Sequence, residues 1–350
     1  MRVLVTGHNG YIGSVMVRTL MDRGHDVHGL DTYLFEECTL GDETRDVPAL
    51  RKDIRDITAD DLRGFDAVAH LAALCNDPLG DLNATWTGDI NHLASVRLAQ
   101  ASRDAGVQRF LYASSCSLYG AAGDTIMTEE MPMRPLTPYA VSKVRTEADV
   151  ARLATDRFSP VFMRNATAYG VSPRLRADIV LNNLVCWAHT TGRVRILSDG
   201  TPWRPIVHIG DISQAFAEVL VAPHERIHNQ AFNIGSNTEN YRVRDLADIV
   251  ADTVPGCQVE YAEGAGPDPR SYRVDFTKFS NAVPAYVPEW DARRGAAELY
   301  EAVRAAGLTE EQFRGRKYLR LGQIKHLLDT GQLDESLRWT TSPRVSAAAV

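Results

Sequence analysis

The chain has 350 residues, of which 44% are hydrophobic and 24% are charged, and its formal net charge at pH 7 is −7. Such a composition is typical of a soluble globular protein with one large or two medium domains, and the negative charge argues against a broad nucleic-acid-binding surface. The five cysteines include no CxxC pair, so the sequence indicates neither a disulfide framework nor a metal site.

The chain starts directly with an apolar segment that runs into a glycine turn, which is unlike a signal peptide. It contains no apolar run of the roughly 20 residues that span a bilayer. We therefore expect a cytoplasmic protein that has no membrane partner.

Short apolar strands alternate with helical segments through the first half of the chain. The strands are predicted at Arg2–Thr6, Asp26–Asp31, Ala67–Leu71 and Phe110–Ser114, and the helices at Ile12–Arg23 and Asn91–Ala105. This alternation predicts right-handed crossovers and an α/β fold, with a doubly wound parallel (Rossmann) sheet.

Beyond about residue 172 the alternation loosens, and proline and glycine separate the helical stretches. We predict a Rossmann domain at residues 1–172 and a smaller α+β domain for the substrate at residues 173–310. Segments near 205–240 are expected to return to the first domain.

The end of the chain is predicted to be a separate addition. A helical extension is expected at residues 311–340, with a basic helix over Arg314–Leu328. Residues 341–350 are small, polar and rich in alanine, so we expect a disordered tail there.

A glycine-rich turn connects the first strand to the first helix. Gly7, Gly10 and Gly13 stand in a GxxGxxG spacing, with Tyr11 and Ile12 at the start of the helix. Glycines there let a pyrophosphate approach the backbone N–H groups at the helix N-terminus. The turn predicts a dinucleotide-binding site.

Asp31 closes the second strand, 18 residues after Gly13. A carboxylate at this place accepts hydrogen bonds from an adenosine ribose and repels a 2′-phosphate, so NAD is favoured over NADP. Later strand ends are expected to line the same crevice, with Asp53, Ile54, Leu71, Ala72 and Ala73.

Tyr139 and Lys143 are four residues apart and share one face of a helix that Pro138 starts. A nearby ammonium and an oxidised nicotinamide favour the phenolate, so Tyr139 is predicted to remove a hydroxyl proton while hydride leaves the same carbon. Ser115, in the serine-rich turn after the strand at Phe110–Ser114, is predicted to hydrogen-bond the reacting oxygen.

The TGxxGxxG turn, Asp31, the HLAA sequence at 70–73, Asn91, SSxxxYG and YxxxK together resemble the extended short-chain dehydrogenase/reductase family. More narrowly, the chain resembles nucleotide-sugar epimerases and dehydratases of the UDP-galactose 4-epimerase type, over roughly residues 1–300. The resemblance implies tightly held NAD, a nucleotide-diphosphate sugar as substrate, and a homodimer packed through two helices per subunit. It also adds Asn91 to the cofactor site.

The same resemblance assigns roles to individual residues. Ser115 matches the catalytic Ser/Thr, Tyr139 the acid/base, and Lys143 the residue that orients the nicotinamide ribose. For the substrate, the resemblance implies two arginines on the diphosphate, where a guanidinium pairs bidentately. The substrate residues, with Ser115, are Cys116, Thr167 (where the family usually has asparagine), Asn182 or Asn183, Arg204 and Arg270.

The departures from the family indicate the subtype. Sugar 4,6-dehydratases carry Thr-Asp-Glu where this chain has Ser115, Cys116 and Ser117, so the acid and base of elimination are missing. Decarboxylases of UDP-glucuronate usually have a glutamate at the Ser117 position, and enzymes that epimerise C3 and C5 need an acid/base there. We therefore expect C4 epimerisation of an NDP-hexose through a transient 4-keto intermediate.

Two other hypotheses stay open. The first is an NDP-sugar dehydratase or net oxidoreductase of the same family that uses Cys116 as an unusual acid/base. The second is a non-catalytic dinucleotide-binding sensor or scaffold, because a fold alone does not determine function. The loop at Cys75–Pro78 is expected to face the sugar.

Overall fold

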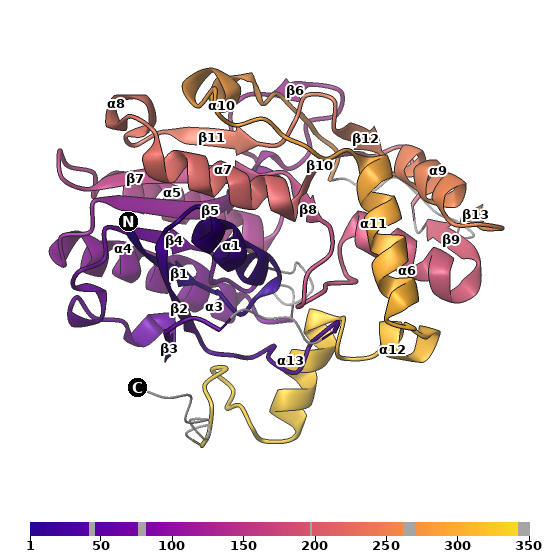
Figure 1. The fold of residues 1–350 in the computed structure, drawn as a ribbon, viewed down its shortest axis with the longest axis horizontal. Helices are drawn as coiled ribbons and strands as arrows, with labels where there is room; N and C mark the ends of the chain where they lie inside the picture. The colour runs from indigo at the N-terminus through magenta and orange to yellow at the C-terminus, as the bar shows by residue number, and fades with distance from the viewer. Residues whose placement is uncertain (42–45, 76–81, 197, 262–269, 342–350) are drawn as a thin grey trace.

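The structure is a computed structural model, and it describes residues 1–41, 46–75, 82–196, 198–261 and 270–341. Its centre is a seven-stranded parallel sheet in the order β11-β7-β5-β4-β1-β2-β3 (Figure 1). The strands are β1 (Arg2–Thr6), β2 (Asp26–Asp31), β3 (Ala49–Arg51), β4 (Ala67–His70), β5 (Arg109–Ser115), β7 (Ser159–Asn165) and β11 (Ala231–Ile234). The chain moves outward from β1 through β2 and β3 and then returns to β4 on the other side. The predicted doubly wound parallel sheet is confirmed.

Successive side chains along a central strand point into two different hydrophobic cores, one on each face of the sheet. Val3 and Val5 face the core in which α1 (Tyr11–Asp22) and α7 (Ile209–Val221) pack, whereas Leu4 faces the core under α4 (Ala94–Asp104) and α5 (Pro138–Ala151). A strand buried on both faces is a continuous apolar run, since neighbouring side chains point to opposite faces. The predicted strands and first helix therefore match the structure within one residue at each end.

A second group of elements lies at the carboxyl edge of the sheet. The helices α6 (Val180–Thr191), α9 (Val243–Thr253) and α11 (Ala292–Ala305) pack on one another, and β9 (Arg193–Ile196) pairs with β13 (Gln258–Tyr261) (Figure 1). Although α7 and β11 follow α6 in the chain, they belong to the Rossmann part. The remaining elements are β6 (Ile126–Met127), β8 (Thr167–Tyr169), β10 (Trp203–His208), β12 (Asn240–Arg242), β14 (Arg273–Val274), α3 (Ala84–Trp86), α8 (His224–Ile227) and α10 (Thr277–Ala282).

The end of the chain differs from the predicted single helix over Arg314–Leu328. The structure has two helices, α12 (Glu310–Arg314) and α13 (Arg320–Asp329), because the chain leaves the helical conformation at Gly315. Between them Tyr318 is 7% exposed, and its carbonyl accepts a hydrogen bond from the Ala177 N–H (2.9 Å). A continuous helix could not make this contact, since its carbonyls are used within the helix. The tail predicted to be disordered lies outside the described residues from 342 onward.

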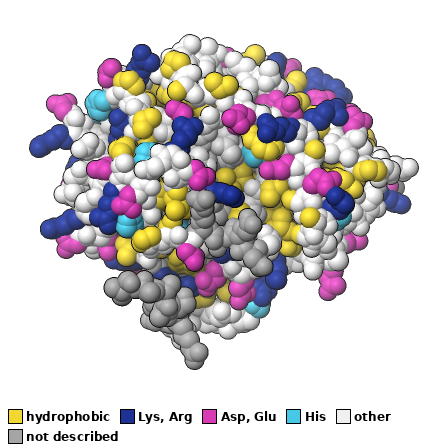
Figure 2. Space-filling view, in the orientation of Figure 1, with side chains coloured by type: hydrophobic (Ala, Val, Ile, Leu, Met, Phe, Trp, Pro, Cys, Tyr) yellow, Lys and Arg dark blue, Asp and Glu magenta, His cyan; other side chains and the backbone are white. Residues whose placement is uncertain are grey.

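Basic and acidic side chains are interspersed over the face shown in Figure 2, where no broad basic area stands out. Among the described residues, no helix combines the length and the hydropathy needed to cross a membrane.

A buried ion pair connects α5 to the central strands. The Arg164 Nη2 of β7 lies 2.7 Å from the Glu147 Oε2 of α5, and the two side chains are 5% and 6% exposed. The Arg164 Nε also donates to both carboxylate oxygens, and the Ser114 hydroxyl of β5 donates to Oε1 (2.5 Å). The position of α5, and of the residues it carries, therefore depends on a fully bonded carboxylate.

We expect Glu147→Gln to lower the free energy of unfolding by about 3–5 kcal/mol, because it leaves the Arg164 charge buried without a partner. Urea unfolding at pH 7 measures this change. The matched control is Glu310→Gln, which removes the ion pair with Arg314 on the exposed surface of α12. That variant should unfold like the wild type, since exposed pairs contribute little. Equal losses in the two variants would contradict the role of the buried pair.

Candidate functional site

A cavity of about 790 Å³ lies along the carboxyl edge of the sheet. Its wall includes the glycine turn after β1, the ends of β2, β4 and β5, the residues after β7, and the first turns of α5 and α6. In open α/β sheets, ligands bind at the carboxyl ends of the strands. The volume is in the range of small-molecule and cofactor sites.

Most of the residues predicted for the cofactor and the substrate line this one cavity. They are Gly7, Gly10, Tyr11, Ile12, Gly13, Asp31, Asp53, Ile54, Leu71, Ala72, Ala73, Ser115, Tyr139, Lys143, Thr167, Asn183, Arg204 and Arg270. Three predicted residues, Asn91, Cys116 and Asn182, are not in its wall. Cys75 lines the cavity, whereas Asn76–Pro78 lie outside the described residues.

The glycine turn packs too closely against the protein's own backbone to accept side chains at Gly7 and Gly13. Gly7 has φ +73°, and a Cβ there would lie 2.9 Å from the Ala72 N. A Cβ on Gly13 would lie 2.1 Å from the Gly7 carbonyl oxygen. No side chain caps the N-terminus of α1, so its first N–H groups are left for an anion. These features fit the pyrophosphate of a dinucleotide.

The Asp31 carboxylate is held at the end of β2 by two backbone N–H groups. Its oxygens accept hydrogen bonds from the N–H of Asn9 (3.1 Å) and of Tyr33 (2.7 Å). Burial raises the pKa of this carboxyl, and the charge of His8 and the two hydrogen bonds oppose the rise. Each carboxylate oxygen can accept more than one hydrogen bond, so Asp31 retains capacity for ribose hydroxyls.

The predicted catalytic pair lies at the start of α5. The Thr137 hydroxyl caps the helix by accepting from the Ala140 N–H (3.2 Å), and Pro138 fits the first helical position. The Lys143 Nζ donates to the Ala113 carbonyl (2.7 Å) and lies 5.5 Å from the centre of the Tyr139 ring. Burial lowers the pKa of the Lys143 ammonium to about 8.

The turn after β5 separates Ser115 from Cys116. The Ser115 hydroxyl lines the cavity and accepts a hydrogen bond from the Ser117 N–H (3.1 Å). Cys116 is fully buried outside the wall, where its Sγ donates to the Arg164 carbonyl (3.1 Å). Burial raises the pKa of this thiol well above its usual value. Cys116 therefore lies behind the site and stays protonated.

Asn91 and Asn182 hold parts of the wall in place. The Asn91 amide accepts from the Leu74 N–H (2.7 Å) and donates to the Leu74 carbonyl (3.0 Å), and Leu74 is itself a cavity residue of the loop after β4. The Asn182 amide accepts from the Gly170 N–H and donates to the Tyr11 hydroxyl (3.0 Å). In this structure Asn91 and Asn182 contact wall residues, and Asn183 faces the cavity instead.

The two predicted diphosphate arginines come from separate segments and lie together. The Arg204 Nη1 donates to the Trp203 carbonyl (2.8 Å) and to the Arg270 carbonyl. Arg204 and Arg270 both line the cavity, as does Thr167. The distance along the chain between Arg204 and Arg270 gives no hint of this contact.

Many residues of the wall were not predicted from the sequence, among them Arg176, Asp178, Arg320 and Leu337. Arg176 and Asp178 form a buried ion pair (2.8 Å), and Arg320 and Leu337 come from the end of the chain. A signal existed for the first pair, since Arg174, Arg176 and Asp178 place three charges at alternate positions after a glycine turn. No family pattern covers Arg320 and Leu337.

The comparisons with known proteins agree with this geometry. The model of the NAD dependent epimerase/dehydratase family matches residues 3–235. The UDP-glucose 4-epimerase of Mycolicibacterium smegmatis is 29% identical over 322 aligned residues, and the match covers 87% of this chain and 99% of that protein.

Two solved structures are similar over their whole length. MoeE5 in complex with UDP-glucuronic acid and NAD is 28% identical with a TM-score of 0.76, and the match covers 87% of this chain and 100% of that one. DesIV, a dTDP-glucose 4,6-dehydratase from Streptomyces venezuelae with NAD bound, is 27% identical with a TM-score of 0.76, covering 89% and 100%. The resemblance drawn from the sequence motifs is confirmed, and with it the NAD dependence of the family. The chain belongs to the NAD dependent epimerase/dehydratase family.

Proposed function

We propose that the protein is an NDP-hexose 4-epimerase, which inverts C4 of a nucleotide-activated sugar through a transient 4-keto sugar. The observation that carries this proposal is the continuous cavity with Gly7 and Asp31, Tyr139 and Lys143, and Arg204 in one wall. It offers room for a dinucleotide and a nucleotide sugar with one acid/base between them. Similar proteins include both 4-epimerases and 4,6-dehydratases, so the choice between the two rests on the side chains.

The cofactor residues would hold NAD against the glycine turn. The backbone N–H groups after Gly10 would bind the pyrophosphate, and Asp31 would accept from the adenosine ribose. Lys143 would donate to the nicotinamide ribose, since its ammonium lies at the wall beside Tyr139. When bound, NAD supplies reversible hydride transfer at a carbinol carbon.

Tyr139 would exchange one proton with the C4 oxygen. Its phenolate takes the hydroxyl proton during oxidation, and the resulting phenol returns the proton after the keto sugar has presented its other face. The Lys143 ammonium, 5.5 Å from the ring centre, favours the phenolate. The Ser115 hydroxyl accepts from the Ser117 N–H, so its own hydrogen is left to bond the C4 oxygen.

Arg204 and Arg270 would bind the diphosphate of the substrate, and Asn183 and Thr167 would contact it or the sugar. A guanidinium pairs with phosphate oxygens through two parallel hydrogen bonds, which fixes orientation as well as position. Thr167 stands in place of the family's asparagine, so its shorter side chain would help to set the sugar preference. The predicted homodimer and cytoplasmic location remain predictions.

Elimination would need a second acid/base beside Tyr139. The carboxylates in the described wall are Asp31 at the adenosine end, Asp53, which pairs with Arg55 (2.6 Å), and Asp178, which pairs with Arg176. Each of them already has a partner in the protein. Together with the buried Cys116, this disfavours a dehydratase and supports chemistry at one carbinol carbon.

We expect C4 epimers to interconvert when the NAD-loaded protein is incubated with UDP-, dTDP-, GDP- and CDP-hexoses and C4 configuration is followed by NMR. Tyr139→Phe should slow the reaction by at least about 100-fold, because it removes the acid/base. The amount of NAD bound per protein chain, measured by absorbance after release of the cofactor, should be the same in Tyr139→Phe as in the wild type. Absence of C4 inversion with every sugar would contradict the proposal, and NAD binding without any turnover would favour the sensor.

Cys116→Ser should turn over at the wild-type rate, because the side chain bonds the Arg164 carbonyl behind the site. Initial rates with the best sugar of the panel measure this, with Tyr139→Phe as the inactive control. A large loss of rate at an unchanged melting temperature would instead favour the hypothesis that Cys116 is an acid/base.

The rate of epimerisation should fall as the pH rises through about 8. Burial lowers the pKa of Lys143 to about 8, so its ammonium is present below that pH and lost above it. Lys143→Arg keeps a positive charge throughout this range, so its profile should lose the alkaline limb even though its rate is lower. If the rate of Lys143→Arg falls above about pH 8 as the wild-type rate does, the titrating group is not Lys143.

A further inference from the structure

The end of the chain, residues 309–341, lies beyond residues 3–235, which the family model matches, and we call it the C-terminal segment. Nothing in the reaction proposed above uses this segment. The segment nevertheless contacts the loops that line the cavity, and two of its residues, Arg320 and Leu337, line the cavity themselves.

The C-terminal segment shares a small core with the loops that follow β2 and β4. Leu34 follows Asp31 by three residues, and Leu74 comes directly after Ala73, so both belong to loops that line the cavity. The buried members of this core are Leu34, Leu74, Trp86, Ile324, Leu327, Leu333 and Leu337. The segment is therefore packed against the walls of the cavity.

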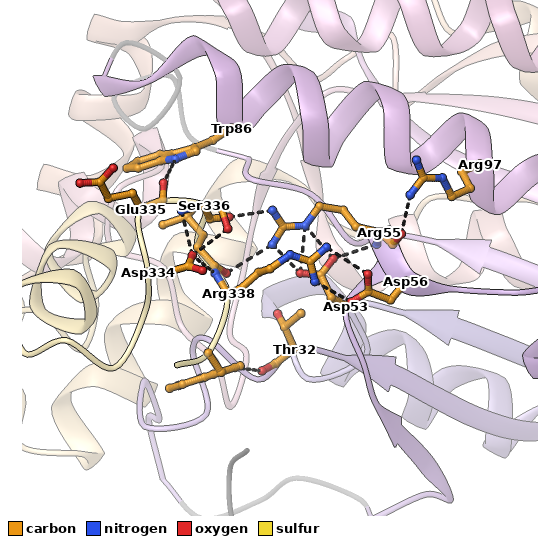
Figure 3. Close-up of polar contacts among 12 residues, drawn as sticks. Thr32, Asp53, Arg55, Asp56, Trp86, Arg97, Asp334, Glu335, Ser336 and Arg338 are labelled. Carbon is orange, nitrogen blue, oxygen red and sulfur yellow. Dashed lines mark hydrogen bonds and ion pairs between the residues drawn. The ribbon is translucent and has the colours of Figure 1, made fainter. Parts of the chain in front are cut away.

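Two tryptophans fix the last turn of the segment by hydrogen bonds to backbone carbonyls. The Trp86 Nε1 donates to the Glu335 carbonyl (2.7 Å), as Figure 3 shows. In the opposite direction, the Trp339 Nε1 of the segment donates to the Thr32 carbonyl (2.7 Å), one residue beyond Asp31. The segment is thus attached at the strand end that carries the predicted ribose ligand.

Charged groups attach the same turn to the residues after β3. Arg55 pairs with Asp53 of the cavity wall and donates to the Ser336 carbonyl (2.7 Å), and Arg338 forms a bidentate pair with Asp56 (2.6 and 3.0 Å) (Figure 3). Side chains of the C-terminal segment and side chains of the residues after β3 both take part in these contacts. The position of the segment on the Rossmann part therefore depends on the sequences of both regions.

Leu337 is held in a strained conformation at the cavity. Its φ is +60°, a region that leucine rarely adopts, and its side chain is 2% exposed. The side chain lines the cavity with Asp31, Asp53 and Ile54. A strained backbone conformation persists only where packing contacts stabilise it. Here those contacts hold the apolar Leu337 in the part of the cavity near Asp31, where the adenosine of NAD would bind.

Arg320 brings a buried positive charge to the same wall. It is 4% exposed; its Nη2 donates to the Arg174 carbonyl (2.7 Å), while its Nη1 is buried without a hydrogen-bond partner among the described residues. Burial and the charge of Arg176 lower the pKa of this guanidinium, and the charge of Asp178 opposes that shift. A buried cation is costly unless it is paired, so this arrangement calls for an anionic ligand.

We propose that the C-terminal segment completes the dinucleotide site, with the Arg320 guanidinium as a ligand of the cofactor's diphosphate and Leu337 as the wall beside the adenosine. The inference depends on the NAD site but not on the C4 reaction. The segment thereby holds the cofactor and slows its release.

The position of Arg320 favours the diphosphate of the cofactor over that of the substrate. Arg174, to which Arg320 is bonded, donates its Nε to the Asn9 Oδ1 in the glycine turn (3.0 Å). The Arg174 Nη1 is likewise buried without a partner among the described residues. The arginines predicted for the substrate, Arg204 and Arg270, come from other segments. The Arg204 guanidinium donates a hydrogen bond to the Arg270 carbonyl.

The test compares Arg320→Met with Lys325→Met in the full-length protein freed of nucleotide. Lys325 is on the same helix but exposed, so both changes remove one positive charge from α13. Dissociation constants are measured by calorimetry for NAD, ADP-ribose, adenosine and UDP. Arg320→Met should weaken NAD and ADP-ribose by roughly 10- to 100-fold and leave adenosine and UDP unchanged, as expected for one charge-assisted contact to a diphosphate. Lys325→Met should bind all four like the wild type.

Arg320→Lys keeps the positive charge and a donor for the Arg174 carbonyl. Its dissociation constants for NAD and ADP-ribose should lie between those of Arg320→Met and the wild type, and this variant replaces Arg320→Met in the test if Arg320→Met does not fold. Unchanged NAD binding in the Arg320 variants would overturn the proposal. So would a loss confined to UDP, which would assign the guanidinium to the substrate, or an equal loss for adenosine, which would indicate a structural role. Because binding is measured without turnover, a failed epimerase assay leaves this test intact.

Discussion

The parallel pairing of the central strands is the constraint on which the site depends. Because each crossover returns the chain to the same end of the sheet, all the carboxyl ends meet at one edge. The glycine turn at Gly7, Asp31, Ser115 and the residues after β7 therefore line one cavity despite their separation in the chain. A different strand direction would scatter the same motifs over two edges and destroy the site without changing a single side chain.

The position of α5, the helix that carries Tyr139 and Lys143, depends on buried charge rather than on apolar packing alone. Glu147 of α5 receives hydrogen bonds from Arg164 of β7 and Ser114 of β5, and Lys143 donates to the Ala113 carbonyl. These bonds have directions, so they fix the rotation of α5 about its axis. That rotation decides whether Tyr139 faces the cavity, which a purely hydrophobic contact would control less strictly.

The sequence was informative where one rule governs several consecutive residues. Continuous apolar runs identified β1, β4 and β5, and the glycine spacing located the cofactor turn, because both depend on local backbone requirements. Side-chain direction was harder to predict. Cys116 and Asn182 are next to cavity residues in the chain but face away, since neighbouring positions on a strand end or helix point in different directions. The contribution of Arg320 could not be predicted, because it depends on a long-range contact and on no repeated pattern.

The role proposed for the C-terminal segment fits the proposed C4 epimerisation. An enzyme that oxidises and then re-reduces the same carbon ends each cycle with its cofactor in the starting state, so exchange of the cofactor brings no benefit. Release between the two half-reactions would leave a keto sugar without the hydride it needs. In the proposed site, Leu337 and Arg320 of the cavity wall, with Trp339 hydrogen-bonded to the loop after β2, would oppose that release and leave the Arg204 end of the cavity to the substrate. Retention of the cofactor and access of the substrate are thus assigned to opposite ends of one cavity.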